Sequence, residues 1–144
     1  MMDDYLQELN LIDLISEKHK KLRREVMKLW LENGGEEVTD TEAHMLAMLE
    51  KSSLTIAESA RKVGVTRQAA HKCAKKLIEQ GYIKMEDIEG NKRDKLIVLT
   101  EKGKVYCSEM LKIKKKMEEE ISMKIGRDNV EMIKMYLRRD WIGD

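Results

Sequence analysis

The stretch LTIAESARKVGVTRQAAHKCAKKLIEQGYI, residues 54–83, predicts two short helices that meet at a tight turn. Thr55 followed three residues later by Glu58 is the pattern of a capping box, and Gly64 suits the left-handed backbone where a helix ends. Thr66 can cap a second helix that carries small apolar residues on one face. Two helices joined in this way predict a helix-turn-helix.

The second of these helices predicts an outer face rich in hydrogen-bond donors. Four polar side chains follow the helical repeat there: Gln68, His71, Lys72 and Lys75. Residues 61–76 contain six Lys or Arg and no acid, although the formal charge of the whole chain is only +1. Such a concentrated basic patch is typical of a surface that meets a polyanion, with a merely solvated helix face as the alternative.

After Gly81 the pattern changes to that of a β-hairpin. Apolar and charged residues alternate over residues 83–86, turn residues follow at 89–91, and residues 96–99 form a β-rich apolar run. We expect the tip, residues 91–95, to present further basic side chains beside the second helix.

Long amphipathic helices are predicted on both sides of this region. Apolar spacing predicts one helix from Tyr5 to Trp30, a capping box at Thr39 predicts another, and two more are expected after Thr100 and Asp128. The predicted fold class is mainly α with a small β-hairpin wing (α+β). We expect a single domain over 1–144, with a winged helix-turn-helix at 39–100 and dimerisation helices at 1–33 and 104–144.

Composition excludes several classes of protein. At 144 residues the chain fits one domain, and no run approaches the roughly 18 apolar residues of a membrane span. Acids at the N-terminus argue against a secretory signal, so a cytoplasmic protein is expected. Cys73 and Cys107 lie outside any CxxC spacing, which favours buried thiols over a redox sensor and predicts neither a disulfide framework nor a metal site. We see no catalytic constellation or nucleotide loop, and expect a non-enzyme without a cofactor.

The two motifs together resemble the MarR family (multiple antibiotic resistance regulators) of winged helix-turn-helix proteins. The resemblance rests on residues 54–83 and on GNKRDKLIVLTEKG, residues 90–103, and with the flanking helices it covers nearly the whole chain. It implies a two-fold dimer, a recognition helix in the major groove and a wing Arg in the minor groove. The residues to which it assigns DNA contacts are Thr66, Arg67, Gln68, His71, Lys72 and Arg93. Three basic neighbours on the same surface complete the DNA-binding candidates: Lys75, Lys92 and Lys95. Asn91 stands where the family usually has an Asp that buttresses the wing Arg.

The function implied is a sequence-specific dimeric transcription regulator, a bacterial repressor that binds a pseudo-palindromic operator in double-stranded DNA. Family members commonly respond to a small-molecule effector that releases the DNA. The main alternative is a winged-helix module that binds protein and not specific DNA. Concentrated Arg and Lys on the predicted recognition helix weigh against that alternative, since a protein-binding helix would more often expose apolar anchors.

Two further sets of residues are candidates for dimerisation and effector binding. The dimer-interface candidates are apolar residues of the terminal helices: Ile12, Ile15, Ile121, Tyr136, Leu137 and Trp141. The alternative is that these residues pack only within their own subunit. The effector-pocket candidates are Trp30, His44 and Met48, with ordinary core packing as the alternative.

Overall fold

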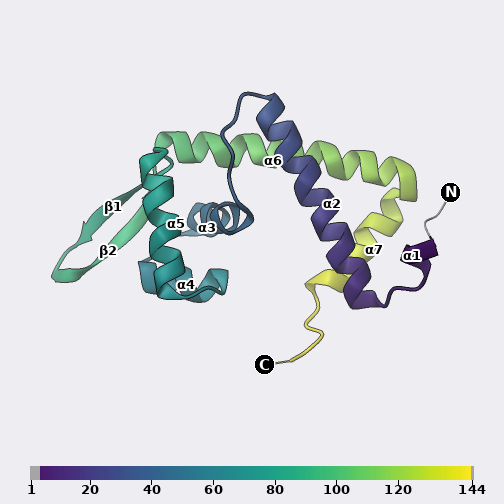
Figure 1. Ribbon diagram of the computed structural model, residues 1–144, viewed down its shortest axis with the longest axis horizontal. Coiled ribbons are helices and arrows are strands. Elements are labelled where there is room, and N and C mark those ends of the chain that lie inside the picture. The colour runs from purple at the N-terminus through teal and green to yellow at the C-terminus, as the bar shows by residue number, and fades with distance from the viewer. Residues whose placement is uncertain (1–3, 144) are drawn as a thin grey trace. The chain divides into compact units, whose positions relative to one another are not determined.

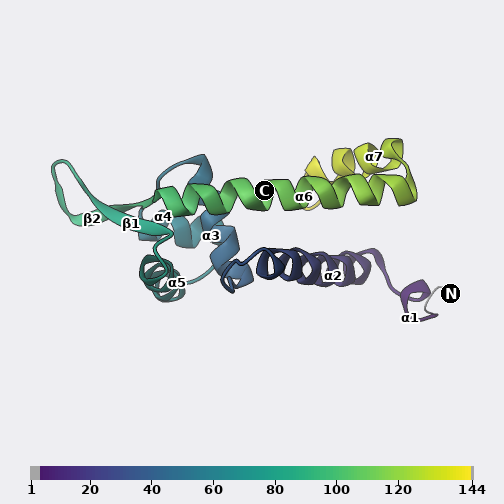
Figure 2. The ribbon, with the colours of Figure 1, turned by 90° about the horizontal axis from the view of Figure 1, so that it is seen from above.

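The structure of the protein is a computed structural model, which describes residues 4–143. Within that range it has seven helices and one two-stranded antiparallel sheet (Figures 1 and 2). In chain order the elements are α1 (Asp4–Gln7), α2 (Leu11–Glu32), α3 (Asp40–Lys51), α4 (Ile56–Val63), α5 (Arg67–Glu79), β1 (Ile83–Ile88), β2 (Asn91–Leu99), α6 (Glu101–Ile125) and α7 (Arg127–Arg138). The predicted fold class is confirmed.

The chain divides into two compact units, the first up to Met110 and the second from Leu111, so the boundary falls within α6. The first unit contains the helix-turn-helix and the hairpin. The predicted single domain, with its division into 1–33, 39–100 and 104–144, stays a prediction.

The first predicted helix is broken near its start. α1 ends at Gln7 and α2 begins at Leu11, because the side chain of Asn10 accepts a hydrogen bond from the backbone N–H of Asp13 at 2.8 Å. This contact satisfies one of the free donors of a helix start. The prediction of one helix from Tyr5 to Trp30 is therefore wrong before Leu11.

The caps predicted for the helix-turn-helix are present. Both capping boxes form: Thr39 with Glu42 begins α3, and Thr55 with Glu58 begins α4. Gly64 ends α4 with φ 81°, a left-handed conformation that costs glycine little. The hydroxyl of Thr66 accepts from the N–H of Ala69 at 3.0 Å and caps α5.

The hairpin is a twisted two-stranded arm that extends away from α3, α4 and α5 (Figures 1 and 2). Its strands pair from Ile83 opposite Leu99 to Asp87 opposite Lys95, with an irregularity after Asp87. The segment 91–95, predicted as the tip, belongs to β2 instead, and the turn lies at 89–90. Two backbone hydrogen bonds between Leu54 and Ile97 anchor the base of the arm to the segment before α4.

The core of the first unit lies under the helix-turn-helix. Met45 and Leu46 of α3, Leu77 of α5 and Ile97 of β2 are fully buried. Small side chains on the inner face of α5, Ala70 and Ala74, are also fully buried and allow the helices to approach closely. A second cluster is aromatic: Trp30 packs edge-on against Tyr106 at 5.2 Å between ring centroids, and Tyr82 lies 5.4 Å from the same ring.

The second unit pairs the C-terminal half of α6 with α7. The carboxylate of Glu118 on α6 forms ion pairs with Lys134 at 3.4 Å and Arg127 at 3.8 Å on α7. Val130 of α7 is buried.

Candidate nucleic-acid interface

The outer face of α5 is exposed and polar. Arg67, Gln68, His71, Lys72 and Lys75 are all exposed, and we call them the basic face of α5. The opposite side of the helix carries the buried Ala70, Cys73, Ala74 and Leu77. This separation means that the basic face contributes little to the core, and its donors remain available to a ligand.

Lys76 of α5 is set apart from the basic face. Its Nζ lies 3.1 Å from the carboxylate of Glu42, whose side chain is only 5% exposed. Glu42 also accepts the backbone N–H of Thr39 within the capping box of α3. One buried carboxylate therefore joins the start of α3 to α5, and the role of Lys76 in this junction is structural.

The β1–β2 hairpin, which we call the wing, presents three exposed basic side chains: Lys92, Arg93 and Lys95. Lys95 lies 3.7 Å from the carboxylate of Asp87 across the hairpin, an exposed pair of small energetic weight. Asn91 organises the start of β2: its Oδ1 accepts the backbone N–H groups of Arg93 at 2.9 Å and Asp94 at 3.1 Å.

The amide of Asn91 also donates to the Asp94 carboxylate at 3.3 Å. Asn91 thus fixes the backbone that carries Arg93 without placing a negative charge at that position. An Asn can therefore order this part of the wing where an acid is usual.

α5 and the wing meet at a cleft of about 340 Å³. Its lining combines the N-terminal end of α4, one side of α5 and the edge of the wing: Thr55, Ile56, Ala57, Arg67, His71, Met85, Arg93, Asp94 and Lys95. Arg67 and His71 thus share one hollow with Arg93 and Lys95, although the two pairs lie far apart in the sequence. A hollow with basic groups from two elements suits an oxyanion such as a phosphate group.

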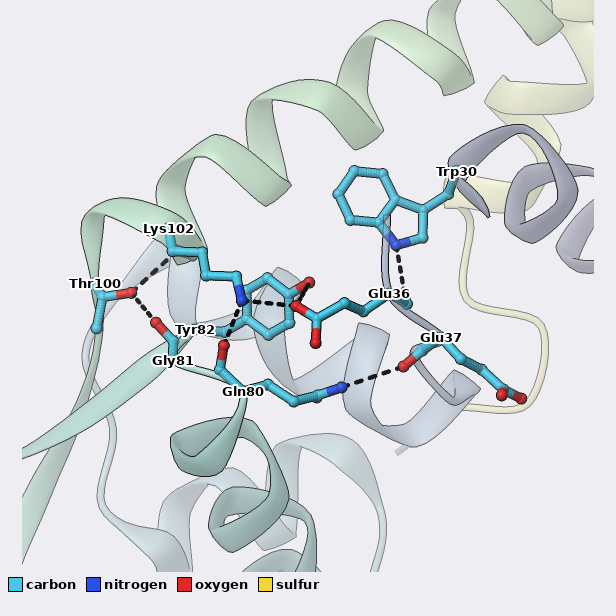
Figure 3. Close-up of polar contacts among 9 residues, drawn as sticks. Trp30, Glu36, Glu37, Gln80, Gly81, Tyr82, Thr100 and Lys102 are labelled. Carbon is cyan, nitrogen blue, oxygen red and sulfur yellow. Dashed lines mark hydrogen bonds and ion pairs between the residues drawn. The ribbon is translucent and has the colours of Figure 1, made fainter. Parts of the chain in front are cut away.

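The C-terminal end of α5 is held by a set of contacts that we call the helix-end clamp (Figure 3). Three successive carbonyls, of Gln80, Gly81 and Tyr82, accept hydrogen bonds from Lys102 Nζ at 2.6 Å, Thr100 Oγ1 at 2.5 Å and Thr100 N at 3.0 Å. Each of these carbonyls lies at or just beyond the helix end, where backbone acceptors lack helical partners.

Lys102 extends the clamp to the loop before α3. Its Nζ also lies 2.6 Å from the carboxylate of Glu36 and 4.7 Å from the ring centroid of Tyr82 (Figure 3). The hydrogen bond from Lys102 is the main cause that lowers the pKa of Glu36. Burial, reinforced by the charge of Glu36, raises the pKa of the Tyr82 hydroxyl to about 12.

Gly103 allows α6 to start so close to this end. A Cβ at position 103 would collide with the carbonyl oxygen of Tyr82. The backbone N–H of Gly103 donates to Thr100 Oγ1 at 3.2 Å. The run from Leu99 to Gly103, at the end of the second motif of the family resemblance, therefore has a physical role. Sequence patterns do not single out Glu36 or Lys102, and they mark Glu42 only as the partner of Thr39 in a capping box. The Thr-x-x-Gly spacing is the one available signal for the clamp.

The effector-pocket candidates are not gathered around one hollow. Trp30 is buried against Tyr106, and its Nε1 donates to the carbonyl of Glu36 at 2.7 Å, whereas His44 is exposed and Met48 is partly buried. None of the three lines the hollows described for residues 4–143. The assignment stays a prediction, and the contacts of Trp30 are those of a core residue.

A different hollow, of about 750 Å³, lies beside α2 and the start of α3. Basic residues of α2 contribute much of its lining: His19, Lys20, Arg23, Arg24 and Lys28. Arg23 Nε donates to the carboxylate of Asp40 at 3.0 Å, while its Nη2 is buried without a hydrogen-bond partner among residues 4–143. A buried guanidinium nitrogen without an acceptor retains hydrogen-bonding capacity that the described residues do not use.

The dimer-interface candidates expose apolar surface on both units. In the first unit, Ile12 is 78% exposed and Ile15 is also exposed. In the second unit, Tyr136, Leu137 and Trp141 are each about half exposed, and Ile121 is partly buried. Large exposed apolar side chains in such numbers are typical of a surface that another molecule covers.

Both cysteines are buried, and Cys107 Sγ donates to the carbonyl of Leu46 at 3.8 Å. Burial raises the pKa of the Cys73 thiol to about 11, and the Glu42 carboxylate adds to that shift. Among residues 4–143 no group of three or more His, Cys, Asp or Glu side chains is placed to hold a metal ion. No helix in the same range is both long and apolar enough to cross a membrane.

Comparisons with known proteins agree with this geometry. The sequence model described as MarR family matches residues 37–94, from the loop before α3 into the wing. The HTH-type transcriptional regulator TcaR of Staphylococcus aureus (strain Newman) is 29% identical over 103 residues, which cover 70% of this chain and 68% of TcaR.

Solved structures show the same fold at low sequence identity. The reduced form of MarR from E. coli aligns with a TM-score of 0.77 at 18% identity, over 90% of this chain and 95% of that one. NadR in complex with 4-hydroxyphenylacetate aligns with a TM-score of 0.69 at 14% identity, over 95% of this chain and 94% of NadR. The family model and the TcaR relative, together with a fold shared with MarR, indicate the MarR family of transcription regulators.

Proposed function

We propose that the protein is a homodimeric repressor that binds a pseudo-palindromic operator through α5 and the wing, and that a small anionic effector releases it. One observation carries the DNA-binding part. The basic face of α5 and the basic residues of the wing border one cleft, lined by Arg67, His71, Arg93 and Lys95. A single ligand that runs between helix and wing can therefore meet both.

Double-stranded DNA fits this arrangement. The major groove, about 12 Å wide, admits an α-helix, and the sugar-phosphate strand that borders it separates it from the next minor groove. With α5 in the major groove, that strand runs through the cleft and Arg93 reaches the minor groove, where its charge favours a narrow, strongly negative groove. Gln68 suits a bidentate contact with adenine, and Arg67 suits guanine or phosphate.

Dimerisation is supported by the exposed apolar residues of the terminal helices. Ile12 on α2 and Tyr136, Leu137 and Trp141 at the C-terminal end are large exposed apolar side chains of the kind that a partner subunit covers. A two-fold dimer predicts two half-sites about one helical turn of DNA apart. A charged residue at Leu137 would then produce monomers in light scattering while leaving the circular dichroism spectrum unchanged.

An effector is supported by the hollow beside α2, where Arg23 Nη2 is buried without a partner among the described residues. NadR, which shares the fold, was solved with 4-hydroxyphenylacetate, a small aromatic carboxylate. We propose that a carboxylate of this kind binds Arg23 and competes with Asp40 for its guanidinium. Calorimetric titration of the protein with 4-hydroxyphenylacetate provides a first probe, with Arg23→Met as the variant that should not bind.

The decisive experiment measures DNA binding by fluorescence anisotropy, using the intergenic DNA beside the protein's own gene at two or more salt concentrations. Arg93→Ala should weaken binding to all sequences, while Gln68→Ala should change the preference among them by about 1–3 kcal/mol at one base position. Lys51→Ala, an exposed residue at the end of α3, is the control and should bind as the wild type does. Binding that does not weaken with salt would contradict the proposal.

A further inference from the structure

Lys102 is a cation at an unfavourable position in its own helix. It lies in the first turn of α6, where the positive end of the helix dipole disfavours a cation. A residue that is unfavourable in its own helix commonly has a compensating contact elsewhere. Here that contact is the negative, C-terminal end of α5.

The contact of Lys102 with α5 reaches an acceptor that the helix itself leaves free. Backbone N–H groups beyond the helix already satisfy earlier carbonyls: Gly81 N donates to Ile78 O at 2.9 Å and Tyr82 N to Leu77 O at 3.0 Å. The carbonyl of Gln80 accepts from Lys102 Nζ at 2.6 Å (Figure 3).

The same Nζ lies 2.6 Å from Glu36, and the Tyr82 hydroxyl donates to that carboxylate at 3.3 Å. Gln80 in turn donates from its side chain to the carbonyl of Glu37 at 3.4 Å. The ammonium group of Lys102 is therefore the point in the helix-end clamp at which the end of α5, the start of α6 and the loop before α3 meet.

A small change in the tilt of α5 at its C-terminal end produces a large displacement of its N-terminal residues. With 13 residues and a rise of about 1.5 Å per residue, the helix is about 20 Å long. A tilt of about 5° about its C-terminal end would move the N-terminal residues Arg67 and Gln68 by about 1.7 Å. Side chains that read bases need placement to within about 0.5 Å, so even this tilt would disturb recognition.

We propose that Lys102 is a positioning residue for DNA recognition: it sets the orientation of α5 by binding the C-terminal carbonyl of Gln80 and the carboxylate of Glu36 with one ammonium group. This inference rests on the proposed function, in which α5 enters the DNA. Lys102 itself does not belong to the basic face of α5 or to the wing, and it does not line the cleft between them.

Lys102→Met tests the proposal, because methionine keeps the apolar stem over Tyr82 and removes only the charge and its hydrogen bonds. Lys104→Met is the matched control, since Lys104 lies two residues further along α6 and pairs within its own helix, with Glu101 at 3.2 Å. Two readouts are needed: hydrogen exchange of amides 77–82 in the free protein, and the dissociation constant for the intergenic duplex over a range of salt concentrations.

We expect Lys102→Met to exchange faster at residues 77–82 and to bind DNA about 3- to 30-fold more weakly, with an unchanged slope of log affinity against log salt. Lys102→Arg should recover most of that affinity, and Lys104→Met should match the wild type in both readouts.

Two results would overturn the inference. If Lys102→Met has the same hydrogen exchange and the same DNA affinity as the wild type, the ammonium group does not position α5. A salt slope reduced by about 0.9 in Lys102→Met would make Lys102 a phosphate ligand instead. A wild-type protein that binds no DNA would refute the proposed function, while the exchange readout would still decide whether Lys102 holds the helix end.

Discussion

Lys75 and Lys76 are neighbours with the same charge, yet we expect loss of Lys76 to lower the stability of the fold and loss of Lys75 to alter DNA binding. Lys75 is exposed on the basic face of α5, whereas Lys76 forms an ion pair at 3.1 Å with the buried Glu42. Lys76→Met leaves the Glu42 carboxylate buried without its cation, and the backbone N–H of Thr39 remains as a donor to it. Lys75→Met removes a charge that faces solvent or DNA.

The expected magnitudes follow from burial. Removing one partner of a fully buried pair costs about 3–5 kcal/mol, and since the Lys76 side chain is 44% exposed we expect about 1–3 kcal/mol for Lys76→Met. For a chain of this size that lowers the melting temperature by about 3–10 °C. Lys75→Met should change the melting temperature by less than about 2 °C, as surface substitutions commonly do.

The salt dependence of DNA binding should show the reverse: it should change on loss of Lys75 and not on loss of Lys76. Removing a cation that neutralises one phosphate lowers the slope of log affinity against log salt by about 0.9. We expect Lys75→Met to lower that slope and Lys76→Met to leave it unchanged. Thermal unfolding followed by circular dichroism and anisotropy titrations at several salt concentrations measure both quantities. The reasoning is refuted if Lys76→Met lowers the slope as Lys75→Met does while its melting temperature stays at the wild-type value.

Two other predictions concern titratable groups. The pKa of Glu36 lies below its ordinary value of 4.5, chiefly through the hydrogen bond from Lys102, so its contribution to stability is present above pH 4.5 and is lost as the pH falls through the folded value. Glu36→Gln should therefore lose less stability than the wild type when urea unfolding is compared at about pH 5 and about pH 3. Burial raises the pKa of Cys73 to about 11, so in a Cys107→Ala variant its thiol should not react with a thiol-specific disulfide reagent at about pH 8 until urea unfolds the chain. Rapid labelling of the folded variant would show that Cys73 is accessible.

Local patterns account for most of the helix-turn-helix. The capping boxes at Thr39 and Thr55 and the stop at Gly64 depend on residues close together in the chain, so sequence alone predicts them well. The break at Asn10 has the same kind of signal, an Asn before a helix with an acid three residues later. The apolar spacing conceals this break because the same spacing continues on both sides of Asn10. A helical repeat of apolar residues carries no information about where a cap interrupts the helix.

Contacts between distant residues do not show in such patterns. Lys76 resembles one more charge in a basic run, and its partner Glu42 is 34 residues away. Lys102 resembles an exposed cation on a long helix, and Glu36 is 66 residues away from it. In both cases the charge is evident from the sequence, but whether it faces a partner or solvent depends on how the helices pack.

The separation of Lys76 and Lys102 from the basic face of α5 bears on how new DNA specificities can arise. The contacts that hold the helix use its buried side and its C-terminal end, while Gln68, His71 and Lys72 lie on the exposed side and carry little of the packing. Substitutions at those three positions can therefore be sampled at small cost in stability. Duplicated copies of such a gene could diverge toward different operators by changes at a few codons, and the same positions are the natural choice for a library that retargets the protein.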